Sequence, residues 1–284
     1  MSVPNQSDSV RHYYDRNTRR FLALGVGGGQ LAIRRGVWAP GVSTRQEAMQ
    51  YVNRRILGEM EEIGAREVLD LGCGVGGSII YLYGEGKRSF LGVTLSPVQA
   101  DLAARAFEQA GAKQAQVTVG DFCDPSFWAA REDLVDLAFS IEATVHVPDL
   151  TEVLAGAAEA VRPGGRLVIV DDFLNGEEPR SPRAVRWLRE FREGWRAPGL
   201  RTPDELRRQA ERAGFRLLRD EDLTSCVELD RPRDLLARAF INVFRWWPGR
   251  GAWFSNLYGG NALQLLLKAR IVTYRYVVFE RSTP

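Results

Sequence analysis

Hydrophobic runs and segments of helical periodicity alternate between residues 66 and 174. Short apolar runs that break at glycine or at polar residues predict five strands, at residues 66–74, 88–95, 115–121, 134–143 and 166–174. Apolar residues at intervals of three and four predict the intervening helices, at residues 77–86, 96–112 and 150–165. Because strand and helix alternate, this part of the chain predicts a mostly parallel sheet with helices on both faces.

Residues with capping preferences mark several helix ends. Ser43 or Thr44 provides an N-cap for a helix over residues 44–62. Ser96 caps the next long helix, and Pro97 occupies its first position. Pro163 and the glycines after it predict where the helix at 150–165 ends.

The remainder of the chain has a different pattern. Two segments look helical and carry many aromatic residues, at residues 181–213 and 231–270. Two further segments predict strands, which gives a sheet of seven, at residues 216–224 and 271–282. We therefore expect three parts: an N-terminal helical cap at 1–62, a ligand-binding core at 63–175, and the rest of the sheet with helical lid insertions at 176–284.

Composition excludes several classes of protein. The 284 residues carry a formal net charge of +2, which gives no argument for a nucleic-acid partner. No window approaches the ~18–20 apolar residues of a membrane span, and the first fifteen residues have no apolar signal core. The three cysteines have no metal-ligand spacing. We therefore expect a reduced, cytoplasmic protein without a membrane anchor.

The segment VLDLGCGVGGS at 68–78 predicts a ligand site. Glycines after a strand let the backbone turn sharply and let a ligand approach the main chain, and the following helix offers free N–H groups. A P-loop is excluded because no GKS or GKT follows, whereas Gly77 leaves the spacing of a dinucleotide fingerprint open. Asp70 disfavours a pyrophosphate and suits a cofactor with a cationic amino-acid portion.

Five segments in the same order resemble one family. VLDLGCGVGG is similar to the first motif of the class I S-adenosylmethionine-dependent methyltransferases. GVTLSPVQ at 92–99 resembles the second-strand motif of one branch, which includes cyclopropane fatty acid synthases, tocopherol and sterol C-methyltransferases and geranyl diphosphate C-methyltransferases. The likeness continues through VGDFCD, FSIEATVHVPDL and VRPGGRLVIVDDF. It implies an α/β, Rossmann-like class I methyltransferase fold with a seven-stranded sheet, and S-adenosylmethionine as the cofactor.

The resemblance also implies roles for single residues in cofactor binding. Asp70 would face the methionine portion, and Thr94 with Gln99 would contact the ribose, where most of the class has an acid. Asp121 and its neighbour would hold the adenine. The implied cofactor residues are Asp70, Gly72, Cys73, Gly74, Gly76, Thr94, Leu95, Gln99, Asp121, Phe122, Ser140 and Ile141. A structural interpretation also exists for three of them: Asp70 and Asp121 as turn residues, and Gln99 as a solvated helix residue.

Three residues are candidates for catalysis. Glu142 follows a buried strand at the carboxyl edge of the sheet, where desolvation raises the basicity of a carboxylate, and the resemblance places a Glu there in the geranyl diphosphate enzymes. His146, one of two histidines, is the rival base, because imidazole suits proton transfer near neutrality. Tyr14 belongs to a YYD segment that, by the resemblance, covers the cofactor. Glu142 and His146 also have purely structural interpretations.

Arginines near the N-terminus and scattered aromatic residues suggest a substrate pocket. Arginine suits phosphate recognition, although a run of charges is also typical of a solvated helix face. Aromatic residues at helical spacing are typical of core packing as well, and the segment RWWPGRGAWF fits either a substrate site or an interface of a homo-oligomer. The residues predicted to bind substrate are Tyr13, Arg34, Arg35, Trp38, Trp187, Trp195, Phe244, Trp246 and Tyr258.

These features predict a methyltransferase that acts on a small, largely apolar molecule. The sequence favours methylation of an isoprenoid carbon, with a prenyl diphosphate as one substrate and Glu142 as the base. Mg²⁺ would then bridge the diphosphate. The alternative is an O- or N-methyltransferase of a natural product that uses His146 without a metal. A non-catalytic cofactor-binding protein or a nicotinamide oxidoreductase is the alternative from another class. The need for a metal and the oligomeric state stay open.

Overall fold

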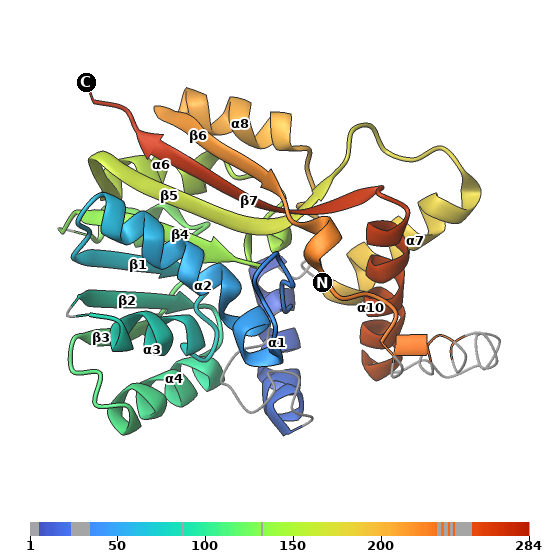
Figure 1. Cartoon of the computed structure of the whole chain (residues 1–284), viewed down its shortest axis with the longest axis horizontal. Coiled ribbons are helices and arrows are strands. Elements are labelled where there is room, and N and C mark those ends of the chain that lie inside the picture. Colours follow the sequence, from blue (N-terminus) through green and yellow to red (C-terminus); the bar gives the residue numbers. More distant parts are fainter. Residues whose placement is uncertain are drawn as a thin grey trace, which may run out of the picture.

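A seven-stranded sheet forms the centre of the molecule (Figure 1). The computed structural model describes residues 6–23, 35–86, 88–131, 133–231, 234–235, 238, 241 and 252–283. Within these residues, the strand order is β3-β2-β1-β4-β5-β7-β6, and only β7 runs antiparallel to its neighbours. The strands are β1 Glu67–Leu71, β2 Ser89–Thr94, β3 Ala115–Val119, β4 Val135–Ile141, β5 Val161–Leu174, β6 Phe215–Asp222 and β7 Val272–Arg281. The predicted α/β fold and its mostly parallel sheet of seven strands are confirmed.

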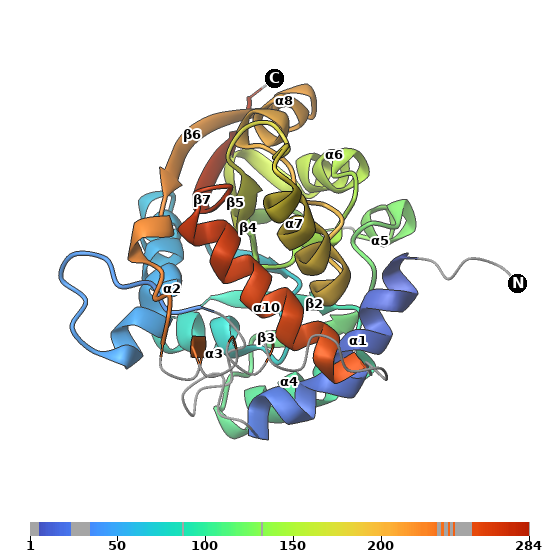
Figure 2. The same cartoon turned by 90° about the vertical axis from the view of Figure 1, so that its right-hand side faces the viewer.

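Helices cover both faces of this sheet and one of its ends (Figures 1 and 2). Helices α2, α3 and α4 pack on one face, and α5, α6 and α8 pack on the other. A third group, α1, α7 and α10, lies across the carboxyl ends of the parallel strands. The helices are α1 Gln6–Ala23, α2 Arg45–Glu62, α3 Gly77–Gly84, α4 Pro97–Gln109, α5 Pro125–Ala129, α6 Thr151–Ala160, α7 Pro182–Trp195, α8 Pro203–Arg212 and α10 Ala252–Lys268, with 3₁₀ turns at Thr144–His146 and Thr224–Cys226.

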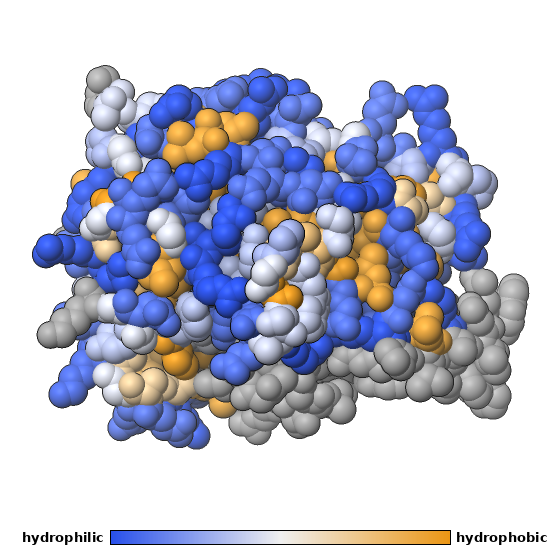
Figure 3. Space-filling model, in the orientation of Figure 1, coloured by the Kyte–Doolittle hydropathy of each residue, from blue (hydrophilic) through white to orange (hydrophobic). Residues whose placement is uncertain are grey.

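The sheet divides the hydrophobic core into two clusters. Successive side chains of a strand point to opposite faces. In β1, Val68 therefore joins the cluster under α2 and α3, whereas Leu69 and Leu71 join the cluster under α6. Figure 3 shows a mostly hydrophilic outer surface on one side of the molecule, with a group of hydrophobic residues over α10. In the described part of the chain, no helix is long and apolar enough to cross a membrane.

Two predicted helices differ from the observed ones. Helix α6 ends at Ala160 and β5 begins at Val161, so the prediction of a helix up to residue 165 is wrong. Val161 is buried and pairs with Val135 of β4, and a β-branched residue packs better in a strand than in a further helical turn. The segment 181–213 forms two helices and not one, because Arg196 adopts a left-handed φ of 54° and ends α7.

N-terminal caps define the first residues of two helices, α2 and α4. The Ser96 hydroxyl accepts a hydrogen bond from the Gln99 N–H at 3.1 Å, and Pro97 is the first residue of α4. Thr44 caps α2 through a reciprocal capping box with Glu47. The predicted caps at Ser96 and Thr44 are confirmed. The cap at Ser96 starts α4 directly after β2, which holds Gln99 at the carboxyl end of the sheet.

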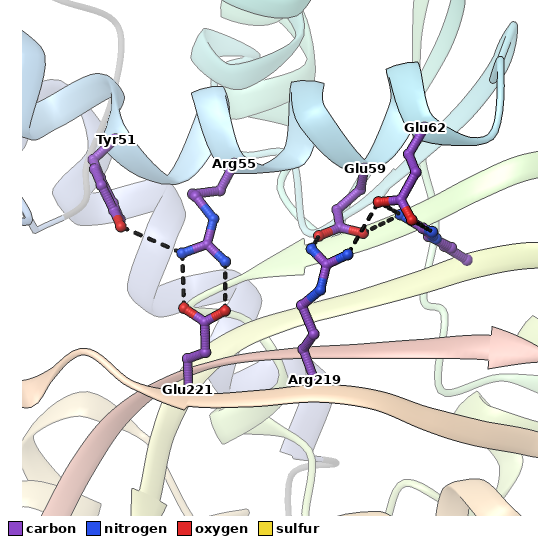
Figure 4. A network of polar contacts seen from close by, with 7 residues as sticks. Tyr51, Arg55, Glu59, Glu62, Arg219 and Glu221 are labelled. Atoms are coloured by element: carbon purple, nitrogen blue, oxygen red, sulfur yellow. Dashed lines mark hydrogen bonds and ion pairs between the residues drawn. The ribbon is translucent and has the colours of Figure 1, made fainter.

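A network of ion pairs fastens α2 to the neighbouring strands (Figure 4). Arg55 forms a bidentate pair with Glu221 of β6, at 2.8 and 2.7 Å. Glu59 accepts from Arg219 of β6 at 2.7 Å and also pairs with Arg166 of β5. Glu59 and Arg166 are both buried, and each has a second partner: Arg219 for Glu59, and Glu62 for Arg166 at 2.7 Å. The network as a whole therefore compensates these buried charges.

Replacement of Glu59 by Gln tests how much this network stabilises the fold. We expect Glu59→Gln to lower the free energy of unfolding by about 3 kcal/mol, because buried Arg166 would lose one of its two carboxylate partners and keep only the more exposed Glu62. Glu177→Gln is the matched control, since its ion pair with Arg180 is exposed and should contribute less than about 0.5 kcal/mol. Urea denaturation of both variants measures the difference. Equal effects would contradict a stabilising role for the network.

Candidate active site

A cavity of about 710 Å³ lies where the parallel strands end against α1, α7 and α10. Open α/β sheets bind ligands at this edge, beyond the carboxyl ends of the strands. The ends of β1, β2 and β4 line one half of the cavity, and residues of α7 and α10 line the other. Its volume lies within the range of about 300–1,000 Å³ that is typical of small-molecule sites.

The loop after β1 allows a ligand to approach the backbone. Gly72 has a φ of 91°, and a Cβ at this position would lie 2.4 Å from the Cβ of Ala143, so only glycine fits. The N–H groups of Gly72 and Cys73 donate to the Val93 carbonyl, which ties the loop to β2. Buried Asp70 beside this open backbone fits a cofactor with a cationic amino-acid portion. The predicted cofactor residues that line the cavity are Asp70, Gly72, Cys73, Gly74, Thr94, Leu95, Gln99, Asp121, Phe122 and Ile141.

Two predicted cofactor residues do not line the cavity. Gly76 has a φ of 79°, and a Cβ there would lie 2.5 Å from the ring of Phe107, so packing explains this glycine. The Ser140 hydroxyl donates to the Leu71 carbonyl at 2.9 Å inside the sheet. Gly76 and Ser140 thus support the neighbouring loops, and their contact with the cofactor stays a prediction.

Side-chain hydrogen bonds join helix α1 to the half of the cavity that the ends of β1 and β2 line. The Ser96 hydroxyl donates to the carboxylate of Asp15, and Gln99 Nε2 donates to Thr18 Oγ1 at 3.2 Å. Gln99 Oε1 accepts from the Thr94 hydroxyl at 2.8 Å. Both amide atoms of Gln99 therefore have partners within the chain. A ribose contact by Thr94 or Gln99 would have to replace or share one of these hydrogen bonds.

Glu142 follows β4 in an unusual backbone conformation. Its N–H donates to the Val170 carbonyl at 2.8 Å, and its φ is 54°. This left-handed conformation costs about 1–3 kcal/mol outside glycine, and such strain often marks a functional site. Glu142 Oε1 accepts from the backbone N–H and the Nε of Arg35, both at 3.3 Å, and from the Tyr274 hydroxyl at 3.0 Å. Among the described residues, no hydrogen bond reaches Oε2, so this oxygen can serve a ligand in the cavity.

Arg35 is the centre of a buried ion cluster beside Glu142. Its guanidinium donates to both carboxylate oxygens of Asp172 at 2.8 Å and lies 4.2 Å from the centroid of the Tyr274 ring. Burial raises the pKa of Asp172 to about 6, although Arg35 opposes this shift. Burial, together with the charge of Glu142, also raises the pKa of Tyr274, which keeps this phenol protonated as a donor to Glu142.

Both ring nitrogens of buried His146 form hydrogen bonds. Nδ1 lies 2.8 Å from the Arg196 carbonyl oxygen, which can only accept, so Nδ1 carries the proton. Nε2 lies 2.9 Å from the Tyr14 hydroxyl and accepts its hydrogen bond. Burial lowers the pKa of His146, against the opposing effects of the Arg196 carbonyl and of Glu142. His146 is therefore a neutral base at neutral pH, in contact with a phenol that also lines the cavity.

Some of the residues that were predicted to bind substrate line the cavity. Arg35 and Trp195 line it. Three other residues are described by the structure but do not line it: Trp38, Trp187 and Tyr258. Four predictions lie outside the described residues, namely Arg34, Phe244, Trp246 and the side chain of Tyr13.

Local geometry explains the positions of the three aromatic residues outside the cavity. Trp187 forms a cation–π contact with an arginine of its own helix at 4.7 Å. Trp38 follows the fully buried Val37 in extended backbone, so the two side chains point to opposite sides. Tyr258 lies two residues after Asn256 on α10, which places it about 200° around the helix from that cavity-lining residue.

Asp172 and Tyr274 are site residues that the sequence analysis missed. The two are cross-strand partners in β5 and β7, although they lie far apart in the sequence. Two consecutive acids in an otherwise apolar strand were an available signal for Asp172 and its neighbour Asp171. Asp171 accepts from the Thr144 hydroxyl at 2.7 Å and so holds the turn that carries His146. No local signal indicated Tyr274, because its position depends on the long-range pairing of β7.

Comparisons with known proteins show the family of the chain. A family model described as "Methyltransferase domain" matches residues 10–219. The chain is 31% identical to the O-methyltransferase cnsE of Penicillium expansum, over 81% of this chain and 79% of that protein. It is 30% identical to 24-methylenesterol C-methyltransferase 2 of Oryza sativa subsp. japonica, over 65% of this chain, and spans 50% of that relative's length.

Two solved structures share the fold of the chain. The cyclase SpnF has a TM-score of 0.74 at 19% identity, with 100% of this chain and 98% of that chain covered. Geranyl diphosphate C-methyltransferase from Streptomyces coelicolor A3(2) has a TM-score of 0.69 at 16% identity, with 99% and 98% covered. At such identities the likeness shows the fold alone. The family model shows that the chain belongs to the methyltransferase domain family. It is therefore an S-adenosylmethionine-dependent methyltransferase, as its sequence motifs predict.

Proposed function

We propose that this protein transfers a methyl group from S-adenosylmethionine to a hydroxyl oxygen of a small, largely apolar molecule. The observation that carries the proposal is the hydrogen bond between Tyr14 and the neutral, buried imidazole of His146, both of which line the cavity. A relative that aligns over four fifths of the chain is named an O-methyltransferase, which supports this choice over carbon methylation.

The ends of the first strands would hold the cofactor. The carboxylate of Asp70 suits an ammonium group, and the glycine backbone beside it allows close approach. Asp121 and Phe122, after β3, would hold the adenine. When bound, S-adenosylmethionine supplies an activated methyl group and leaves as S-adenosylhomocysteine.

The three parts expected from the sequence would divide the work of the site. In this proposal the core at residues 63–175 holds the cofactor, and α1, within residues 1–62, caps it. The region 176–284 completes the sheet with β6 and β7 and adds α7 and α10 over the substrate half of the cavity.

The pair of Tyr14 and His146 would take up the proton that the substrate hydroxyl loses. A hydroxyl that donates to the Tyr14 oxygen can pass its proton there while the Tyr14 proton moves to Nε2 of His146. The imidazolium keeps its Nδ1–H bond to the Arg196 carbonyl, and the negative charge of Glu142 favours it. The site thus offers both an acceptor for the proton and a counter-charge for the buried cation.

Methylation of an isoprenoid carbon, with Glu142 as the base, is a second candidate. The observation that favours it is the Oε2 atom of Glu142 in the same cavity, which has no hydrogen-bond partner among the described residues. Trp195 also offers a ring to a developing positive charge there. A diphosphate substrate would bring Mg²⁺ with it. In the parts of the chain that the structure describes, no group of three His, Cys, Asp or Glu side chains could hold a metal ion.

Cofactor binding is the first test of the proposal. S-Adenosylhomocysteine should bind in isothermal titration calorimetry, and millimolar NAD⁺ should not displace it. Asp70→Asn should weaken binding about tenfold or more, because a charge-assisted hydrogen bond is lost. Asp204→Asn, on the exposed side of α8, is the control and should bind normally. If NAD⁺ displaced S-adenosylhomocysteine, the alternative of a nicotinamide oxidoreductase would be supported instead.

Three variants separate the two candidate bases. With S-adenosylmethionine and a panel of phenols, alcohols and prenyl compounds, product is detected as the mass gain of one methylene group. His146→Ala should lower kcat about 100-fold or more and Tyr14→Phe about tenfold, because proton transfer is impaired. Glu142→Gln should lower it less than about tenfold. His12→Ala, at the exposed second histidine, is the matched control. Carbon methylation would instead be established if a carbon-methylated product still forms in His146→Ala but no longer forms in Glu142→Gln.

The pH profile gives an independent test of the base. Since burial lowers the pKa of His146 from 6.5, kcat/KM should reach its plateau by neutral pH and fall only as the pH drops below about 6.5. The acidic limb should be absent from the residual activity of His146→Ala. A limb that persists in this variant would assign the titration to Asp172, whose pKa is about 6.

A further inference from the structure

The charges of the described residues that line the cavity do not favour an anionic substrate. Among the described residues that line it, eight are Asp or Glu and three are Arg. Each of these arginines already has a carboxylate partner within the chain. Arg45 pairs with Glu228 at 3.5 Å, and Arg231 pairs with Asp234 at 2.8 Å. Among these residues, an anion would meet an excess of carboxylates and would have to displace one of them to reach one of the three arginines.

Arg35, the arginine nearest the catalytic residues, is the most firmly engaged. Its Nη atoms both donate to Asp172, its Nε donates to Glu142, and the ring of Tyr274 covers one face of the guanidinium. The side chains of Asp172 and Glu142 are only 4% and 13% exposed, so neither can turn to solvent without rearrangement of the strands. The guanidinium donors that could bind a phosphate are therefore already bound to carboxylates of the protein.

Helix α10 presents neutral polar groups to the opposite side of the same cavity. Asn256, Gly260 and Gln264 line it at intervals of four residues, among leucines of the same helix. Gln264 Oε1 is buried and has no hydrogen-bond partner among the described residues. A buried carbonyl oxygen without a partner is unfavourable, and a donor from a bound ligand would satisfy it.

We propose that the cavity selects an uncharged substrate that bears at least two hydrogen-bonding groups, and that Gln264 accepts a hydrogen bond from a hydroxyl of that substrate. The inference rests on the proposed methyl transfer to a hydroxyl oxygen and adds the charge and polarity of the molecule that carries it. One hydroxyl would lie at Tyr14, and a second would lie at α10. Gln264 is in this account a specificity-determining residue without a part in proton transfer.

Binding of matched ligands to the complex with S-adenosylhomocysteine tests the charge selection without any turnover. Geraniol and geranyl diphosphate share one carbon chain and differ in charge. We expect the dissociation constant of geranyl diphosphate to be at least tenfold higher than that of geraniol, with and without Mg²⁺. Equal or tighter binding of the diphosphate would overturn the proposal, and so would a failure of geraniol to bind at all.

The role of Gln264 is tested with 8-hydroxygeraniol, which adds a second hydroxyl to the same chain. Gln264→Met should remove the affinity gain of the second hydroxyl, a loss of about fivefold, and leave the affinity for geraniol unchanged. Gln264→Glu retains an acceptor oxygen and should retain the gain. Gln109→Met, at an exposed position of α4, is the matched control. A parallel loss for both ligands would mean a merely structural role for Gln264, and no loss for either would mean that it does not contact the substrate.

Failure of this inference and failure of the proposed function give different results. The affinities are measured on the complex with the product cofactor, so they do not depend on methyl transfer. A diphosphate that binds tightly while His146 remains essential would refute the substrate class alone. Selective binding of uncharged ligands in a protein that methylates none of the hydroxyl compounds would refute the proposed reaction alone.

Discussion

The buried ion pair between Arg35 and Asp172 is the interaction on which the substrate half of the site depends. A buried guanidinium is costly unless carboxylates accompany it, and Asp172 and Glu142 supply two. The pair joins the segment at residue 35 to β4 and β5, and Tyr274 of β7 stacks on it. Four separate segments are thereby held around one charge. The left-handed backbone at Glu142 is tolerated in this setting because its side chain is bound from two directions.

Helix α1 connects the cofactor half of the cavity with the proposed base. Tyr14 and Thr18 lie four residues apart and therefore on one face of the helix. Tyr14 reaches His146 after β4, whereas Thr18 reaches Gln99 at the start of α4. The Thr18 hydroxyl also donates to the Tyr14 carbonyl at 2.7 Å, which links the two contacts. The position of one helix thus sets the closure of the cofactor site and the hydrogen bond to the base together.

The sequence allowed prediction of the fold and of residues after β1, β2 and β3 that line the cavity, because both depend on local signals. Glycine after a strand and the cap at Ser96 are each encoded by a few neighbouring residues. The alternation of strand and helix is a succession of such short patterns. The ion cluster was not predictable in this way. Arg35 was predicted to bind substrate, with phosphate recognition as one interpretation of the arginine run. Only the three-dimensional arrangement brings Asp172 to its guanidinium. The pairing of Asp172 with Tyr274 depends on the antiparallel insertion of β7 between β5 and β6, for which no short pattern exists.

The protonation state of His146 is the point on which the proposed chemistry rests most directly. The protein has two histidines, so ¹⁵N NMR of histidine-labelled protein, with His12→Ala for assignment, resolves the ring nitrogens of His146. In the complex with S-adenosylhomocysteine, we expect a neutral ring with the proton on Nδ1, a pKa below 6.5, and a change at Nε2 in Tyr14→Phe. A His146 that is protonated at neutral pH, or that carries its proton on Nε2, could not accept the proton from Tyr14 and would contradict the account.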